Sequence, residues 1–183
     1  MIIGITGTDG AGKGAVVQHL VKEHGFLYVS SRAQIEAELE LRGLPATREN
    51  LREGGNIMRR QHGNGVLVTR ALEVVRRQQA KNAVIESIRA MAEVEVLHAA
   101  HGVLWAVDAN PKERYRRITG RASASDQVTY EEFKAQEAIE MNDPDPNGMQ
   151  KAAVMAAADY TIMNDHSLKA LYQQINATLQ NIQ

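Results

Sequence analysis

The sequence predicts an α/β fold in which a five-stranded parallel sheet is covered by helices on both faces, giving three layers. Two observations support this prediction. Five short apolar runs recur along the 183 residues, and segments of helical period lie between them. Strands that alternate with helices form parallel sheets with right-handed crossovers. The length suits one such unit, so we expect residues 1–183 to form a single domain.

The first expected strand is the isoleucine-rich run at residues 2–5, because β-branched residues fill strands that are buried on both faces. A loop begins at Gly7. Apolar residues at helical spacing over residues 16–21 then predict a helix, with Gly25 as its C′ residue. A glycine-rich turn therefore joins a buried strand to the start of a helix.

This turn, Gly-Thr-Asp-Gly-Ala-Gly-Lys at residues 7–13, fits the pattern G-x-x-x-x-G-K. Glycines in this pattern let backbone N–H groups converge on phosphate oxygens, and the helix N-terminus favours the same anion. We expect Lys13 to reach the β- and γ-phosphates. The predicted nucleotide-binding residues of this segment are Thr8, Asp9, Gly10, Ala11, Gly12, Lys13, Gly14 and Ala15. The alternative is a glycine-rich turn without a ligand.

The residues after the lysine depart from the usual motif. A serine or threonine commonly follows and supplies a hydroxyl ligand for Mg²⁺, whereas Gly14 and Ala15 follow here. We therefore expect no direct protein ligand for Mg²⁺, which would be held through phosphates and water, with Glu86 as a candidate partner.

A second strand is expected at residues 26–29. Ser31 and Gln34 have the spacing of a capping box for the next helix, which extends to about Arg42. Residues 47–80 also have a helical pattern.

Two glycine-containing segments interrupt that pattern. They are Gly54-Gly55 and Gly63-Asn64-Gly65, and we expect them to act as hinges.

A third strand, residues 83–85, ends in polar residues. Glu86 follows directly and Arg89 comes three residues later. Because ligands bind at the carboxyl edge of open parallel sheets, we expect Glu86 to contact a Mg²⁺-bound water or the acceptor, and Arg89 to bind an acceptor phosphate. The alternative is that the two side chains pair with each other.

The fourth strand, residues 103–107, leads into a helix with Asn110 as its N-cap and Pro111 at its first position. One face of this helix would carry Arg114, Arg117 and Arg121, spaced at i, i+3 and i+7. We expect this cationic face to reach across bound phosphates, with Arg117 and Arg121 as catalytic candidates. The alternative is a solvated face.

The rest of the chain continues the alternation. A capping box at Thr129 and Glu132 begins a helix to about Met141, and an alanine-rich helix precedes the fifth strand at residues 160–163. A terminal helix follows. Asn164 lies at the end of the fifth strand, where we expect it to approach the nucleotide base.

The composition is that of an ordinary globular protein, with 44% hydrophobic residues and a net charge of -1. This charge gives no field to attract nucleic acid or an anionic membrane. Zero cysteines exclude disulfides and thiol catalysis. Neither a leader pattern nor a run of about 18 apolar residues occurs. We expect a cytoplasmic monomer or homodimer that binds small nucleotides, with no nucleic acid and no membrane as partner.

Several segments, in this order and spacing, resemble the P-loop nucleoside monophosphate kinase superfamily, and within it the adenylate-kinase-related, dephospho-CoA-kinase-like (UPF0200-like) group. They are residues 29–31, 47–51, 84–97, 109–121, 129–133 and 158–171. The resemblance implies a P-loop NTPase fold with strand order 2-3-1-4-5, a helical lid near residues 118–145 and an acceptor-binding region near residues 31–80.

The resemblance also implies roles for individual residues. Arg59 matches an arginine of the related group and would bind the acceptor. The loop GTDGAGK is similar to that of thymidylate kinases, in which the aspartate faces the acceptor sugar, so Asp9 would bind the acceptor as well.

These observations predict an ATP- and Mg²⁺-dependent phosphotransferase that acts on a nucleoside monophosphate or a similar acceptor. Lys13, Glu86, Arg117 and Arg121 are its predicted catalytic residues, because phosphoryl transfer depends mainly on positioning and on neutralising charge. Dephospho-CoA kinase is the alternative within the same class. A nucleotide-binding switch, or a degenerate kinase without efficient transfer, is the alternative of another class.

Overall fold

The computed structural model describes residues 1–120 and 128–182. Its five strands form one parallel sheet in the order β2-β3-β1-β4-β5, which confirms the predicted fold class and strand order. The strands are β1 (Ile2–Gly7), β2 (Leu27–Ser30), β3 (Ala83–Glu86), β4 (Val103–Asp108) and β5 (Tyr160–Met163). In the register of the central strands, Ile5 is level with Glu86 and Trp105. Gly7, Glu86 and Asp108 therefore end neighbouring strands at one edge.

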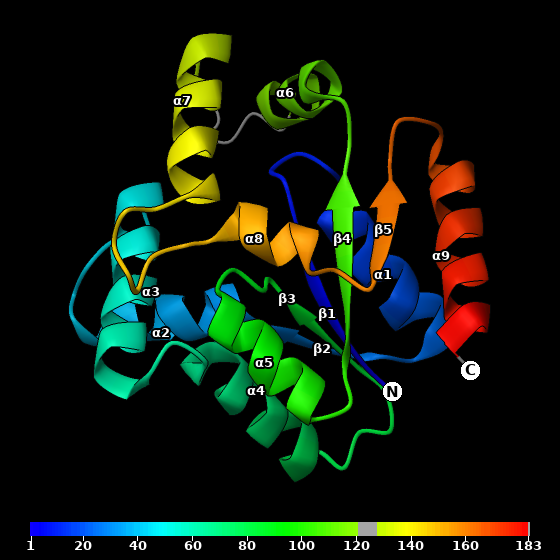
Figure 1. Ribbon diagram of the computed structural model, residues 1–183, viewed down its shortest axis with the longest axis horizontal. Helices are drawn as coiled ribbons and strands as arrows, with labels where there is room; N and C mark the ends of the chain where they lie inside the picture. The colour runs from blue at the N-terminus through cyan, green and yellow to red at the C-terminus, as the bar shows by residue number, and fades with distance from the viewer. Residues whose placement is uncertain (121–127, 183) are drawn as a thin grey trace.

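Helices cover both faces of the sheet (Figure 1). They are α1 (Lys13–His24), α2 (Ser31–Leu41), α3 (Arg48–His62), α4 (Val66–Arg77), α5 (Met91–Ala99), α6 (Pro111–Thr119), α7 (Tyr130–Met141), α8 (Lys151–Ala156) and α9 (Leu168–Ile182). Apolar residues of α1 and α9 pack against one face. Those of α4, α5 and α8 pack against the other. No helix in the described part of the chain is long and apolar enough to cross a membrane.

Several predicted helix ends are confirmed. Gly25 ends α1 with a φ of 66°, and the Asn110 side chain caps α6, which has Pro111 at its start. Thr129 and Glu132 form the expected capping box of α7. The cap of α2 differs from the prediction, because Ser30, and not Ser31, accepts a hydrogen bond from the Ala33 amide.

The Gly54-Gly55 pair was predicted as an interruption, and this prediction is wrong. Helix α3 runs through both residues and ends only at His62. A Cβ at Gly54 would lie 3.0 Å from Ile35 Cγ2 of α2. The glycines therefore serve the close packing of two helices, while the predicted break at residues 63–65 does separate α3 from α4.

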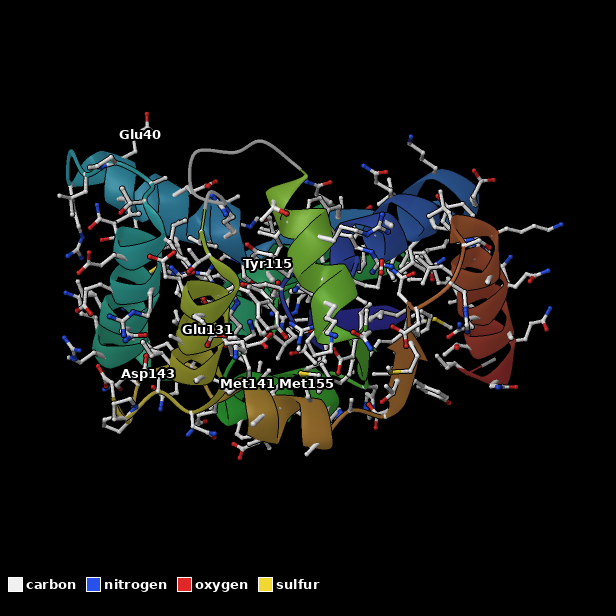
Figure 2. All side chains as sticks on the ribbon, turned by 90° about the horizontal axis from the view of Figure 1, so that it is seen from above. Glu40, Tyr115, Glu131, Met141, Asp143 and Met155 are labelled. Atoms are coloured by element: carbon white, nitrogen blue, oxygen red, sulfur yellow. The ribbon has the colours of Figure 1, made fainter. Side chains whose placement is uncertain are left out.

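Helices α6 and α7 lie beyond the carboxyl ends of the strands (Figure 1). Figure 2 looks down on this edge and shows α6, which carries Tyr115, beside α7, which carries Glu131 and Met141. The rings of Tyr115 and Tyr130 join the two helices, with 5.2 Å between their centroids. This pair of helices overlies the edge where the glycine-rich loop ends β1.

Candidate nucleotide-binding site

The glycine-rich loop has the backbone geometry of a phosphate cradle. Gly7, Gly10 and Gly12 all adopt positive φ, at 134°, 79° and 101°. A Cβ at Gly10 would lie 2.5 Å from the Arg114 carbonyl oxygen, so a side chain there would collide with α6. Glycine is required at such positions because L side chains rarely adopt these angles.

The start of α1 fits an anion. Gly12 is its N-cap and offers no side chain to the first amides, and the first turn contains no acidic residue. Unsatisfied N–H groups and the positive end of the helix dipole therefore face the loop. Loop and helix together fit the polyphosphate of a nucleotide.

Lys13 points back into this loop. Its Nζ donates to the carbonyl oxygens of Thr8 at 2.8 Å and Gly7 at 3.1 Å, and lies 3.5 Å from Asp9 Oδ1. Burial lowers the pKa of Lys13 to about 8, although the Asp9 carboxylate acts in the opposite direction. Lys13 is thus charged at neutral pH and close to the cradle.

Asp9 is held between cations from distant parts of the chain. Arg48 Nη2 of α3 lies 2.9 Å from Asp9 Oδ2, and Lys151 Nζ of α8 lies 3.3 Å from Asp9 Oδ1. Burial would raise the pKa of Asp9, but Lys151, Lys13 and further arginines together hold it well below its usual value. Asp9 is therefore a carboxylate at neutral pH.

Glu140 completes this arrangement from α7. Its Oε1 accepts from Arg48 Nη2 at 2.6 Å, and its Oε2 accepts from Lys151 Nζ at 2.8 Å. We call Asp9, Arg48, Glu140 and Lys151 the four-charge cluster. It joins the glycine-rich loop to α3, α7 and α8, and the sequence analysis did not single out Arg48, Glu140 or Lys151.

An open cleft of about 380 Å³ borders the loop. Its charged lining residues are the cations Lys13, Arg32, Arg48, Arg52 and Arg89 and the carboxylates Asp9, Glu86 and Glu140. Five cations against three carboxylates leave a surplus of two positive charges. The lining itself is therefore net positive, while Glu36 and Asp143, which are not lining residues, pair with Arg32 and Arg52.

Glu86 and Arg89 both line the cleft but do not form a salt bridge with each other. Glu86 Oε2 accepts from the Tyr28 hydroxyl at 3.2 Å. The backbone of Arg89 is held at both ends, since its N–H donates to Glu93 Oε2 and its carbonyl accepts from the Gln150 amide. Among the described residues, the Arg89 guanidinium is in no ion pair, which suits the predicted binding of an anion.

Arg59 is buried in an ion pair with Glu93. Its Nε and Nη2 donate to Glu93 Oε1 at 3.0 and 2.9 Å, while Glu93 Oε2 accepts from the amides of Arg89 and Ala90. Arg59 thus contributes to fixing the segment that carries Arg89.

The predicted arginine face of α6 is divided in the structure. Arg114 is buried and pairs with Glu137 of α7, whereas Arg117 Nη2 donates to the Asn164 carbonyl at 2.7 Å. Arg121 lies outside the described residues. A single cationic face that includes Arg114 is therefore not observed.

Thr8 and Asn164 hold the loop itself. Thr8 Oγ1 donates to Asp108 Oδ1 at 2.6 Å, and Asn164 Nδ2 donates to the Ala11 carbonyl at 2.8 Å. Asn164 was expected beside the nucleotide base, and in the structure its side chain supports the loop backbone.

Comparison with known proteins identifies the family of this chain. The AAA domain family matches residues 3–144. The UPF0200 protein of Pyrococcus abyssi is 31% identical over 189 residues, covering 100% of this chain and 97% of the relative. The chain therefore belongs to the UPF0200 family of AAA-domain proteins. Another UPF0200 protein, from Hyperthermus butylicus, is 28% identical over 170 residues, covering 92% of this chain and 88% of the relative.

Solved structures share the fold of this UPF0200 chain. TT1252 from Thermus thermophilus matches with a TM-score of 0.68 at 21% identity, covering 100% of this chain and 98% of that one. Shikimate kinase from Bacteroides thetaiotaomicron matches with a TM-score of 0.64 at 16% identity and 98% coverage of both chains. A gluconokinase from Sinorhizobium meliloti matches with a TM-score of 0.56 at 12% identity, covering 99% and 91%. The fold is thus that of the P-loop kinases, as the resemblance implied.

Proposed function

We propose that this UPF0200 protein transfers the γ-phosphoryl group of ATP to a nucleoside monophosphate or a similar nucleotide-like acceptor. The main support is the cationic cleft, which runs from Lys13 at the phosphate cradle to Arg89 at the end of β3. Two anions can bind in one cleft of this kind, one at each cation. Holding two anions in line is the principal requirement of phosphoryl transfer.

The reaction needs little covalent chemistry from the protein. A phosphate oxygen of the acceptor would attack the γ-phosphorus, and the bond from this phosphorus to the β–γ bridging oxygen would break, leaving its electron pair on ADP. Lys13 would offset the charge that spreads over the transferred group, and Arg89 would orient the acceptor phosphate. An ionised phosphate needs no base, which agrees with the low pKa of Asp9.

The cleft also bears on how Mg²⁺ would be held. Gly14 and Ala15 supply no hydroxyl, and Asp9 is engaged by Arg48 and Lys151. Glu86, which lines the cleft and accepts from the Tyr28 hydroxyl, would bind a Mg²⁺-bound water. Mg²⁺ bound with the triphosphate would reduce its negative charge.

The test is ADP formation with Mg·ATP and a panel of nucleoside monophosphates and dephospho-CoA. We expect acceptor-dependent ADP that falls by about 100-fold or more in Lys13→Ala. Lys22→Ala, which removes an exposed lysine of the same helix, should keep the full rate. No acceptor-dependent ADP from any nucleotide would refute the proposal, and a response to dephospho-CoA alone would favour the alternative kinase.

A nucleotide-binding switch without efficient transfer is the second candidate, and the missing hydroxyl at Gly14 and Ala15 favours it. This candidate predicts tight ATP binding to which Mg²⁺ adds little. Turnover no faster than that of Lys13→Ala would support the switch, and fast acceptor-dependent turnover would exclude it.

A further inference from the structure

Glu93 is a buried carboxylate that the proposed reaction does not use. It lies in the first turn of α5, and the exposed fraction of its side chain is 0%, against 2% for its partner Arg59. A buried ion pair adds little net stability compared with apolar residues of the same volume, because the cost of desolvating two charges offsets their attraction. Such a pair can instead fix the position of the groups around it.

The two carboxylate oxygens of Glu93 join α3 to the segment before α5. Oε1 accepts from Arg59 Nε at 3.0 Å and from Arg59 Nη2 at 2.9 Å. Oε2 accepts from the backbone amides of Arg89 at 2.6 Å and Ala90 at 3.1 Å. Arg59 therefore sets the orientation of the carboxylate, and the carboxylate sets the position of the Arg89 backbone.

The bond to the Arg89 amide is more than a helix cap. A glutamate at the third position of a helix ordinarily accepts from the N-cap amide, which here belongs to Ala90. The Arg89 amide lies one residue further from the helix, yet its bond to Glu93 is the shorter of the two. Capping α5 requires only the Ala90 bond, so the other bond serves the segment that carries Arg89.

The same segment is held from two further directions. The Ile88 N–H donates to the Ile5 carbonyl of β1 at 2.8 Å. The Arg89 carbonyl accepts from the Gln150 amide at 2.7 Å. Arg89 lines the cleft, and its one side-chain hydrogen bond within the described residues is a 3.5 Å contact from Nη1 to Met149 Sδ. The backbone of Arg89 is thus fixed on several sides, while its guanidinium retains donors for an anion.

We propose that Glu93, oriented by Arg59, is a positioning residue of the acceptor site: it holds the Arg89 backbone where the guanidinium meets the acceptor phosphate. This inference rests on the proposed kinase function and adds residues that act on the acceptor through Arg89. A displacement of about 1 Å in a group that orients a substrate can cost about 100-fold in rate. The residue-level expectation that Arg59 binds the acceptor itself is thereby replaced by an indirect role.

The first test compares acceptor and donor affinity in Glu93→Gln. Calorimetry with AMP, GMP, CMP, UMP and dTMP identifies the monophosphate that the unmodified protein binds most tightly. We expect its affinity to fall by about tenfold in Glu93→Gln, while ATP affinity changes by less than about twofold. Glu95→Gln makes the same substitution at an exposed position of α5 and should change neither affinity.

Two outcomes of this test would overturn the inference. One is that no monophosphate binds the unmodified protein. The other is that Glu93→Gln weakens ATP and monophosphate equally or leaves both unchanged, because a general loosening of the fold would not distinguish the two ligands. A selective loss of monophosphate affinity in a protein that forms no ADP would refute the kinase proposal and leave the role of Glu93 standing.

A double-mutant cycle with Arg89→Met shows whether Glu93 acts through Arg89. We expect Arg89→Met alone to weaken monophosphate binding by about 10- to 100-fold, the usual effect of losing hydrogen bonds to a charged group. Adding Glu93→Gln should then cost less than about twofold more. NMR titration measures dissociation constants in the millimolar range that such variants require. A full tenfold loss in the Arg89→Met background, or no loss in Arg89→Met itself, contradicts the inference.

Arg59→Lys covers the case in which Glu93→Gln does not fold, because it keeps a cation beside the buried carboxylate. A lysine cannot reproduce the contact of two guanidinium nitrogens, so we expect monophosphate affinity to fall by roughly 3- to 10-fold and ATP affinity to stay the same. Arg60→Lys is the matched control, since Arg60 is an exposed neighbour that pairs with Asp145. An unchanged monophosphate affinity in Arg59→Lys, or an equal loss when Arg89→Met is also present, would refute the indirect role.

Discussion

Burial and the Asp9 carboxylate act on the pKa of Lys13 in opposite directions. Burial dominates and lowers the pKa to about 8, so the ammonium loses its proton just above neutral pH. The charged form is the one that attracts phosphate. The pH dependence of nucleotide binding should therefore report on this residue.

We expect ATP affinity to be constant below the pKa of Lys13 and to fall as the pH rises through it. At about pH 9 the loss should approach tenfold, because most Lys13 side chains of the free protein are then neutral. Calorimetry across this range measures the effect. Lys13→Arg keeps its charge and should show no such decline, so the same decline in that variant would contradict the explanation.

Gly14 stands at the position where the usual motif has a serine or threonine that binds Mg²⁺. Apart from its two neighbours and the backbone of its own helix, no atom of the described residues lies within 4 Å of the position that a Cβ would occupy, and its φ is not positive. A side chain therefore fits without strain.

Gly14→Ser should make ATP binding more dependent on Mg²⁺, because it restores the usual hydroxyl. The measurement is ATP affinity with Mg²⁺ and with EDTA in the unmodified protein, Gly14→Ser and Gly14→Ala. The alanine variant controls for helix propensity, which should stabilise both variants by about 0.5–1 kcal/mol. An equal Mg²⁺ effect in all three proteins would show that the hydroxyl has no role.

At the scale of elements, α7 is attached to the phosphate site by two carboxylates one turn apart. Glu137 pairs with Arg114 of α6, and Glu140 joins the four-charge cluster. Arg114 also donates to the Asp9 carbonyl. The helix predicted as part of a lid is therefore linked to the loop through buried charges.

Glu140→Gln should destabilise the protein by about 1.5–3 kcal/mol, because Arg48 and the buried Lys151 lose a charged hydrogen-bond partner while both keep Asp9. Urea denaturation measures this change. Glu131→Gln makes the same substitution on the exposed side of α7, where Glu131 pairs with Lys134, and should cost less than about 1 kcal/mol (Figure 2). Similar losses in the two variants would mean that the cluster does not stabilise the fold.

At the scale of the whole molecule, the candidate nucleotide site draws on both halves of the chain. The four-charge cluster joins the glycine-rich loop to α3, α7 and α8. Asn164, which directly follows β5, supports the same loop by donating to the Ala11 carbonyl. A ligand bound there should stabilise the entire fold, since it binds only the assembled site.

ATP at about one hundred times its dissociation constant should add about 2.7 kcal/mol to the free energy of unfolding. For a chain of this length the melting temperature should rise by roughly 5–10 °C. Thermal denaturation measures the shift, which should disappear in Lys13→Ala and persist in Lys22→Ala. A full shift in Lys13→Ala would show that ATP does not stabilise the protein by binding at the glycine-rich loop.

The features that the sequence predicted correctly depend on residues close together in the chain. The strands, most helix caps and the glycine-rich loop are of this kind, because hydrophobic period and turn chemistry are local. Gly54-Gly55 shows the limit of such reasoning. A glycine pair is typical of a break in a helix. Here α3 continues through both glycines, which allow close contact with Ile35 of α2.

The charged partners of the site could not be predicted in this way. Asp9 meets Arg48 and Lys151 across 39 and 142 residues, and Arg48 meets Glu140 across 92. Any arginine or glutamate on a helix has the same local pattern whether it is solvated or buried in such a cluster.

By itself the sequence determined the layered α/β architecture and the glycine-rich loop with its single lysine, because backbone geometry at glycines and apolar periodicity follow from neighbouring residues. Only the tertiary structure decided which cations surround Asp9, that Arg59 is paired with Glu93, and that Arg114 is buried against Glu137 of α7. Those properties arise from packing between distant segments, and the energy of a charge or the volume of a cavity is set by everything that surrounds it.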